Sequence, residues 1–283
     1  MKPIKKDNPV TLVSVLNDQQ HIKTIMCNGM RWYYDASVPN DDKVFRASMT
    51  SGISKVYPKG EHFYDWIAKF GHWRQVVLGR AQVHGNTVHD GVDMVNKGHT
   101  IDTDWMEMNI INQPNMGWRL ESSIKAMVMD VRKAMESYFA WHDEYNPICL
   151  GSEFVLYHPE HMFAGRTDQL YKIGDDIVLV DNKTGMAHDH HQLQSLGYAH
   201  IYNTYYAPEE YKCNKVGVLY LKKDYRRKPT FGFKMINADP ERYLRYTDYY
   251  ADEYGVPKPK FGFKPRKSFS LNKDKEKDGK SMG

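Results

Sequence analysis

Residues 176–185 read DIVLVDNKTG, an apolar run closed by an acid and a lysine. The four apolar residues 177–180 show no alternation, which predicts a central strand buried on both faces of a sheet. Because side chains alternate across a strand, Asp181 and Lys183 are expected on one face and Asn182 on the other. The end of this strand therefore places a carboxylate beside an ammonium group.

Two upstream segments carry further acids. Residues 153–158 and 162–173 have the composition of strands, with turn residues between them and after the second. The first segment carries Glu153 and the second carries Asp168. If the second strand pairs in register with the strand that follows it, Asp168 lies beside Asp181, and Glu153 joins the same site from the first strand.

Helical patterns surround these strands. Apolar residues recur at three- and four-residue steps over 120–145, and weaker helical patterns cover 61–70, 75–95 and 190–206. A further buried strand is predicted over 216–221. The resulting order of helix, three strands, helix and strand predicts an α/β fold with a mixed central sheet flanked by helices.

The acids and the lysine point to one kind of chemistry. Two carboxylates that lie close together repel each other unless a cation neutralises them, and hard oxygen ligands select Mg²⁺ or Mn²⁺. Such a metal activates a water and stabilises the charge that develops on a phosphate. Lys183 is then placed to hold the attacking water or to offset that charge. We therefore predict hydrolysis of a phosphodiester.

The same residues resemble the PD-(D/E)xK nuclease superfamily, and more narrowly its RecB-like branch. That branch carries a G-x-x-x-H element before the first strand, matched by residues 85–89, and a Q-x-x-x-Y element after the lysine, matched by residues 194–198. The five elements occur in the family's order. Upstream, residues 48–50 (SMT), residues 57–59 (YPK) and nearby aromatic residues resemble the lead-in of the mitochondrial genome maintenance exonucleases of this branch.

The resemblance implies a restriction-endonuclease-like αβββαβ core with an N-terminal helical elaboration, and it implies a role for each matching residue. His89, Asp168, Asp181 and the backbone carbonyl of Asn182 would bind the metal, Lys183 would be the catalytic lysine, Glu153 would bind a second metal or a metal-bound water, and Gln194 and Tyr198 would support the site or contact the DNA backbone.

Two histidine features have competing interpretations. His84 lies five residues before His89, and only the family pattern favours His89 as the ligand. Residues 188–191 (HDHH) have a zinc-like composition but no cysteine partner, so we expect Asp189 to cap a helix and the histidines to be exposed.

Positive charge gathers toward the C-terminus. Residues 255–283 hold nine Lys and Arg against three Asp and Glu, a net charge of +6, which leaves −2 for the rest of a chain whose net charge is +4. We expect a disordered basic tail there, after a lead-in over 1–74 and a nuclease domain over 75–254. A second basic stretch is interpreted equally as a solvated loop or as the wall of a groove for a phosphate backbone; it comprises Lys222, Lys223, Arg226, Arg227 and Lys228.

The three cysteines are scattered and form no C-x-x-C pair, so they predict neither a disulfide framework nor the iron–sulfur cluster that some members of the branch hold with four cysteines. No apolar run reaches the roughly 18–20 residues of a membrane span, and the polar start of the chain lacks a signal peptide. We expect a soluble cytoplasmic protein, and a phage origin is compatible with its small size.

The sequence thus predicts an Mg²⁺- or Mn²⁺-dependent exonuclease that acts on single-stranded DNA or DNA ends in replication, repair or recombination. A structure-selective endonuclease keeps the same chemistry. A catalytically silent DNA-binding or assembly protein on the same fold is the alternative from another class, and RNA as the substrate also stays open.

Overall fold

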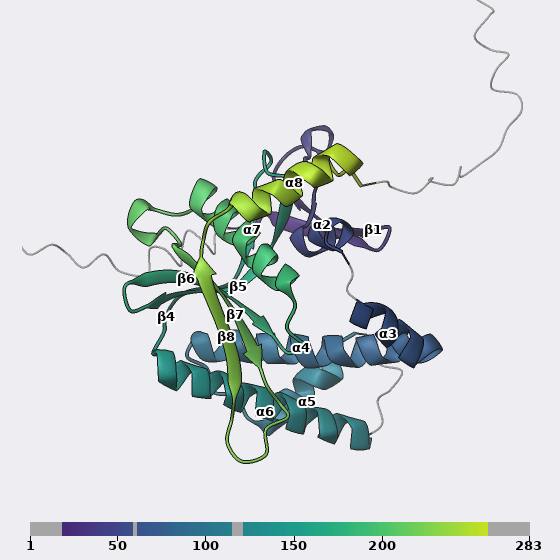
Figure 1. The fold of residues 1–283 in the computed structure, drawn as a ribbon, viewed down its shortest axis with the longest axis vertical. Helices are drawn as coiled ribbons and strands as arrows, with labels where there is room; N and C mark the ends of the chain where they lie inside the picture. The colour runs from purple at the N-terminus through teal and green to yellow at the C-terminus, as the bar shows by residue number, and fades with distance from the viewer. Residues whose placement is uncertain (1–18, 59–60, 115–120, 260–283) are drawn as a thin grey trace, which may run out of the picture.

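The computed structural model describes residues 19–58, 61–114 and 121–259. The chain forms an eight-stranded sheet with helices on both sides (Figure 1). The strands are β1 (Ile22–Cys27), β2 (Met30–Asp35), β3 (Arg46–Ser48), β4 (Ile148–Leu156), β5 (Phe163–Ile173), β6 (Asp176–Lys183), β7 (Lys215–Leu221) and β8 (Phe231–Asn237). The α-helices are α2 (Met49–Val56), α3 (Glu61–Phe70), α4 (Arg74–Asn96), α5 (Thr103–Asn112), α6 (Glu121–Tyr145), α7 (Asp189–Tyr205) and α8 (Glu241–Tyr254).

The sheet is mixed. Its strand order is β1-β2-β3-β5-β6-β7-β8, and β4 pairs with β5 as well. The β3–β5 and β6–β7 pairs are parallel, whereas the other pairs are antiparallel. Parallel pairing of β6 with β7 needs a crossover, which α7 provides. The predicted α/β class, the mixed sheet and the order α6-β4-β5-β6-α7-β7 are confirmed.

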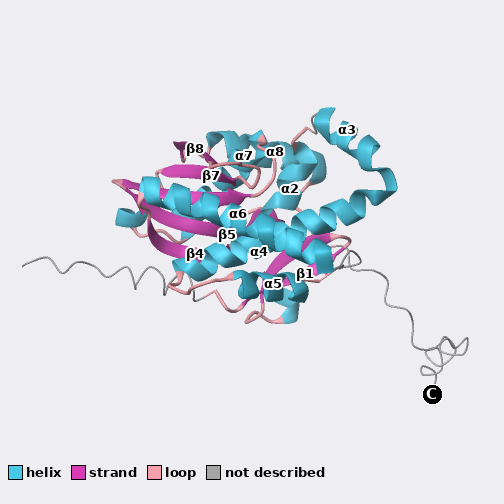
Figure 2. Ribbon diagram, turned by 90° about the horizontal axis from the view of Figure 1, so that it is seen from below, coloured by secondary structure: helices cyan, strands magenta, loops and turns pink. Residues whose placement is uncertain are grey.

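Helices cover the two faces of the sheet and form two hydrophobic cores (Figures 1 and 2). On one face, α2, α7 and α8 pack over side chains such as Leu179 of β6. On the other face, α4, α5 and α6 pack over Val178 and Val180. Strand β6 is buried on both sides, which explains its apolar run without alternation.

The N-terminal region differs from its predicted helical elaboration. It contains helices α2 and α3, but it also contributes strands β1, β2 and β3 to the central sheet. Strand β3 has only three residues, so its sequence carries no readable period, and it joins β5 through two residue pairs, Ala47 with Phe163 and Ser48 with Ala164. The lead-in therefore belongs to the same sheet as the acidic residues.

The first acidic strand begins earlier than predicted. Strand β4 starts at Ile148 rather than at Glu153, and its register with β5 shifts between Cys149 and Gly151. An extra residue at such a bulge breaks the two-residue period, which is why the sequence pattern missed the beginning of the strand.

No helix within the described ranges is long and apolar enough to cross a membrane. Most of the predicted basic tail, from residue 260 onward, lies outside the described residues.

Candidate functional site

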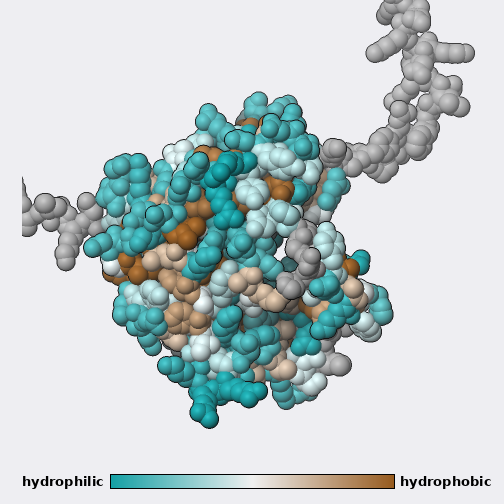
Figure 3. Space-filling view, in the orientation of Figure 1, coloured by the Kyte–Doolittle hydropathy of each residue, from teal (hydrophilic) through white to brown (hydrophobic). Residues whose placement is uncertain are grey.

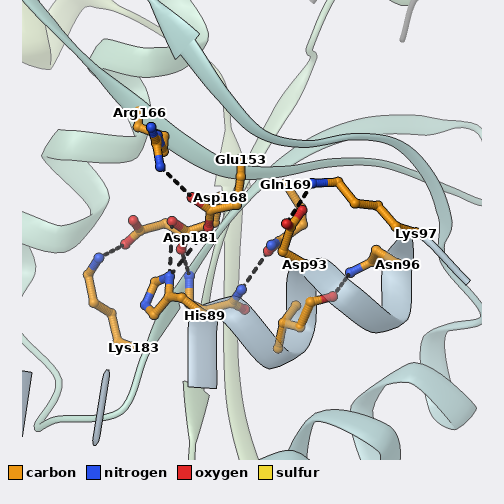
Figure 4. Close-up of polar contacts among 12 residues, drawn as sticks. His89, Asp93, Asn96, Lys97, Glu153, Arg166, Asp168, Gln169, Asp181 and Lys183 are labelled. Carbon is orange, nitrogen blue, oxygen red and sulfur yellow. Dashed lines mark hydrogen bonds and ion pairs between the residues drawn. The ribbon is translucent and has the colours of Figure 1, made fainter. Parts of the chain in front are cut away.

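Three acids lie in a row across three neighbouring strands. Ser152 of β4 pairs with Gln169 of β5, and Phe154 pairs with Thr167, so the register sets Glu153 opposite Asp168. On the other side of β5, Gln169 pairs with Val180, and the next position in this register sets Asp168 opposite Asp181. The hairpin register predicted from the sequence thus gathers the three acids side by side across β4, β5 and β6 (Figure 4).

Glu153 has an unusual backbone conformation within β4. Its φ is +52°, in the left-handed region that a residue with a Cβ rarely enters. Strain of this kind persists where the surrounding structure holds it, and it often marks a functional position. Here the carboxylate of Glu153 turns toward Asp168 and a histidine.

That histidine is His89, which α4 contributes from outside the sheet. Its Nδ1 lies 3.2 Å from Oδ1 of Asp168 and 3.8 Å from Oε1 of Glu153. One ligand atom from each of His89, Glu153 and Asp168 lies within 4.8 Å of the other two, a spacing that can hold a metal ion. The competing His84 is buried on α4 and its charge environment is set by Asp130 and Lys223, so it is not part of this group.

Asp181 has a different partner. Its Oδ2 lies 2.5 Å from Nζ of Lys183, which confirms that the two side chains share one face of β6. Asn182 points to the opposite face, where its amide donates to Oε1 of Gln169. The backbone N–H of Asn182 donates to Oδ2 of Asp168 at 2.6 Å, so this bond orients Asp168 while its other oxygen faces His89.

Burial and charge perturb every titratable group of the site. Burial opposes the charged form of His89, but the carboxylates of Asp168 and Glu153 outweigh it and raise the pKa of His89 to about 10. Burial raises the pKa of Asp181 to about 6 despite the attraction of Lys183, and burial also raises the pKa of Glu153. Such clustered shifts are typical of functional sites.

Gln194 and Tyr198 lie behind the acids. Both side chains are buried on α7; Nε2 of Gln194 donates to the hydroxyl of Tyr198 at 3.1 Å and to Oγ1 of Thr50 at 3.0 Å. Their burial fits a supporting role better than contact with a DNA backbone. Thr50, from the lead-in, is thereby tied to the site.

Gly165 makes room for Tyr198. A Cβ at Gly165 would lie 2.5 Å from Cε1 of Tyr198, whose ring is 2% exposed and cannot retreat. We expect Gly165→Ala to lower the free energy of unfolding by about 1–3 kcal/mol, measured by chemical denaturation. The control is Gly79→Ala on α4, where the added Cβ meets nothing within 4 Å and greater helix propensity adds up to about 1 kcal/mol of stability. Equal stability of Gly165→Ala and the wild type would contradict this packing.

Arg166 is a neighbour of the site that was not predicted from the sequence. Its Nη1 lies 3.9 Å from Oε2 of Glu153. The signal was present, because Arg166 precedes Asp168 by two residues on the same strand and so shares its face. Its side chain remains more than half exposed, which leaves the guanidinium accessible to an anionic ligand.

The basic stretch after β7 forms the loop that enters β8, and it projects at the lower edge of Figures 1 and 3 as a hydrophilic tip. Lys223 is anchored to α6 by an ion pair of 2.7 Å with Asp130. Lys222 is half-buried, and three basic residues are exposed: Arg226, Arg227 and Lys228. Since β7 runs parallel to β6, this loop begins at the end of the sheet that carries Lys183.

No family model matches the chain, and no curated protein matches it significantly.

Proposed function

We propose that the protein is a divalent-metal-dependent deoxyribonuclease with a restriction-endonuclease-like core, acting as an exonuclease on single-stranded DNA or DNA ends. The observation that carries the proposal is the row of Glu153, Asp168 and Asp181 on adjacent strands, completed by His89 and by Lys183. The antiparallel β4-β5-β6 unit, followed by α7 and the parallel strand β7, supports the proposed core.

The residues of the site fit a divalent cation. Oε1 of Glu153 is buried and accepts no hydrogen bond from any described residue, although it faces Asp168 and His89. Two carboxylates favour Mg²⁺ or Mn²⁺, and the imidazole favours Mn²⁺ of the two. When bound, the cation would supply a water of lowered pKa and would neutralise charge on the phosphate. His89, Glu153 and Asp168 would hold it.

Lys183 and Asp181 have complementary roles in this proposal. The ammonium of Lys183 would donate to the attacking water and to a non-bridging phosphate oxygen. Asp181 fixes that ammonium through the 2.5 Å contact. Because Lys183 is 21% exposed in its side chain while Asp181 is buried, the lysine is the member of the pair that a substrate can reach.

Binding of Mn²⁺ should depend steeply on pH. A metal ligand must be a neutral imidazole, whereas the raised pKa of about 10 keeps His89 protonated in the metal-free protein. We expect binding to release one proton and the affinity to rise about tenfold per pH unit between about pH 7 and 8.5. Isothermal titration calorimetry in buffers of different ionisation enthalpy measures the number of protons released, and repeating it at several pH values measures the change in affinity. His89→Ala should bind more weakly and lose the dependence; an unchanged slope in that variant would contradict the assignment of His89.

Substrate form separates the proposed exonuclease from an endonuclease. End-labelled linear single strands, duplexes, RNA strands and covalently closed single-stranded DNA circles are incubated with Mg²⁺ or Mn²⁺. We expect the linear single strand to be degraded and the circle to survive. A cut circle would replace the exonuclease with an endonuclease, and degradation of RNA in preference to DNA would change the substrate. Intact substrates throughout would support a silent binding protein, although the presence of Glu153, Asp168, Asp181 and Lys183 together favours an enzyme.

A further inference from the structure

A continuous series of rings, which we call the ring path, leads from α8 to the catalytic lysine. Neighbouring ring centroids are separated by 5.7 Å (Tyr246–Tyr57), 5.8 Å (Tyr57–His190), 4.5 Å (His190–His191) and 5.9 Å (His191–Tyr220), and His188 stacks on His190 at 5.3 Å. These residues come from four separate elements: α8, the end of α2, the start of α7 and β7.

The inner end of the path touches the proposed site. Tyr220 of β7 pairs with Lys183 of β6, and its hydroxyl lies 3.2 Å from Nδ1 of His191. Burial, with the nearby charge of Lys183, lowers the pKa of His191 to about 3, so this imidazole is neutral near pH 7. Tyr220, the innermost ring of the path, is therefore the direct strand partner of Lys183.

The outer rings are open to solvent. Tyr57, His190 and Tyr246 are half-buried and His188 is exposed, whereas His191 and Tyr220 are buried. The sequence predicts Asp189 as the cap of α7 and exposed histidines. Instead His188 occupies the cap position, Asp189 begins the helix, and the ring of His191 turns inward to meet Tyr220.

The histidines of the path are not arranged as a metal site. Within the described residues, the cluster with three ligand atoms inside 4.8 Å is the one formed by His89, Glu153 and Asp168. The rings of the path instead follow one another, with charged groups beside them. Arg242 hydrogen-bonds to Tyr57, Nζ of Lys222 lies 6.0 Å from the centre of the Tyr220 ring, and the carboxylate of Asp189 also lies near Tyr57. Half-exposed rings can stack on bases, and the cations beside them can pair with phosphates.

We propose that the ring path binds the bases of a single-stranded nucleic acid whose scissile phosphate lies at Lys183, an inference that rests on the proposed nuclease function. Aromatic rings stack on any base because every base has a π face, so the path binds without regard to sequence. A duplex hides those faces in its own stack. The path therefore selects single strands, while the metal site and Lys183 act on the backbone.

The test compares a short thymidine oligonucleotide with an abasic chain of the same length, by fluorescence anisotropy with Ca²⁺, which takes the same oxygen ligands. We expect the wild type to bind the thymidine chain about tenfold or more tightly than the abasic chain. Tyr57→Leu/Tyr246→Leu should remove this difference and leave the affinity for the abasic chain unchanged.

Two control proteins separate stacking from loss of structure. Tyr57→Phe/Tyr246→Phe keeps both rings and should keep the base-dependent affinity. Tyr249→Leu changes an exposed tyrosine on the same helix, outside the path, and should behave as the wild type. Equal affinity of the wild type for both chains, an equal loss of affinity for both chains in the double leucine variant, or the same loss in Tyr249→Leu overturns the ring path.

The ring path and the nuclease function fail in different ways. Base-dependent binding without any cleavage in Mn²⁺ rejects the hydrolysis and retains the ring path. Cleavage by a wild type that binds thymidine and abasic chains equally retains the nuclease and rejects the ring path.

Discussion

Lys183→Ala is expected to cleave single-stranded DNA about 10²–10³-fold more slowly than the wild type, with its fold and its affinity for DNA nearly unchanged. Lys183 supplies a positive charge at the point where negative charge develops on the phosphate, and no other described lysine contacts the acid row. Because Asp181 is buried, the variant leaves a carboxylate without its 2.5 Å partner, and the pKa of Asp181 should rise further above about 6. Single-turnover cleavage of an end-labelled strand measures the rate.

The matched control is Lys215→Ala. Lys215 also forms an ion pair with an aspartate, at 2.8 Å from Asp176, but at the opposite end of the same β6–β7 pair. Its loss removes an ion pair of the same kind away from the acids, so the cleavage rate should stay within about twofold of the wild type. Wild-type cleavage by Lys183→Ala, or an equal loss in Lys215→Ala, would remove Lys183 from the mechanism.

Asp168→Asn is the second change with a large expected effect: cleavage should fall at least about 10³-fold, and Mn²⁺ should no longer bind measurably at micromolar concentration. Asp168 is the middle acid of the row. It accepts from the backbone N–H of Asn182 at 2.6 Å and lies 3.2 Å from Nδ1 of His89. Asparagine keeps the size of the side chain but removes the charge. A loss of cleavage in this variant therefore comes from the missing charge and not from a cavity.

Asp175→Asn controls for the loss of one negative charge in the same hairpin. Asp175 is exposed in the turn between β5 and β6, at the far end from the acids. Titration calorimetry should find wild-type Mn²⁺ affinity in Asp175→Asn. If Asp168→Asn also binds Mn²⁺ as the wild type does, the metal site is not built on this carboxylate.

The part of the site that the sequence predicted follows from local rules. A two-residue turn at Gly174-Asp175 fixes the register of β5 and β6, and that register alone sets Asp168 opposite Asp181. The two-residue period of β6 places Lys183 with Asp181. Helix α6 was predicted because one of its faces is buried from Met127 to Trp141, which gives a long run of apolar residues at helical spacing.

Other features depend on tertiary contacts that no local pattern carries. His84 and His89 are five residues apart on α4, so their side chains point about 140° apart, and the packing of the helix on the sheet decides which of them meets the acids. The left-handed backbone of Glu153 has no sequence signal of its own, because this position is not a glycine. The bulge before it ends at Gly151, and a single glycine in an apolar segment does not by itself specify a register shift. The pairing of β3 with β5 joins residues more than a hundred positions apart.

The most direct test of the account is cleavage of an end-labelled linear single strand by the wild-type protein after dialysis against EDTA, with and without added Mn²⁺, beside Asp168→Asn. We predict no cleavage in EDTA, full recovery on addition of Mn²⁺, and no recovery in Asp168→Asn. Cleavage that persists in EDTA, or that returns with Mn²⁺ in Asp168→Asn, would contradict metal-dependent hydrolysis at the row of Glu153, Asp168 and Asp181.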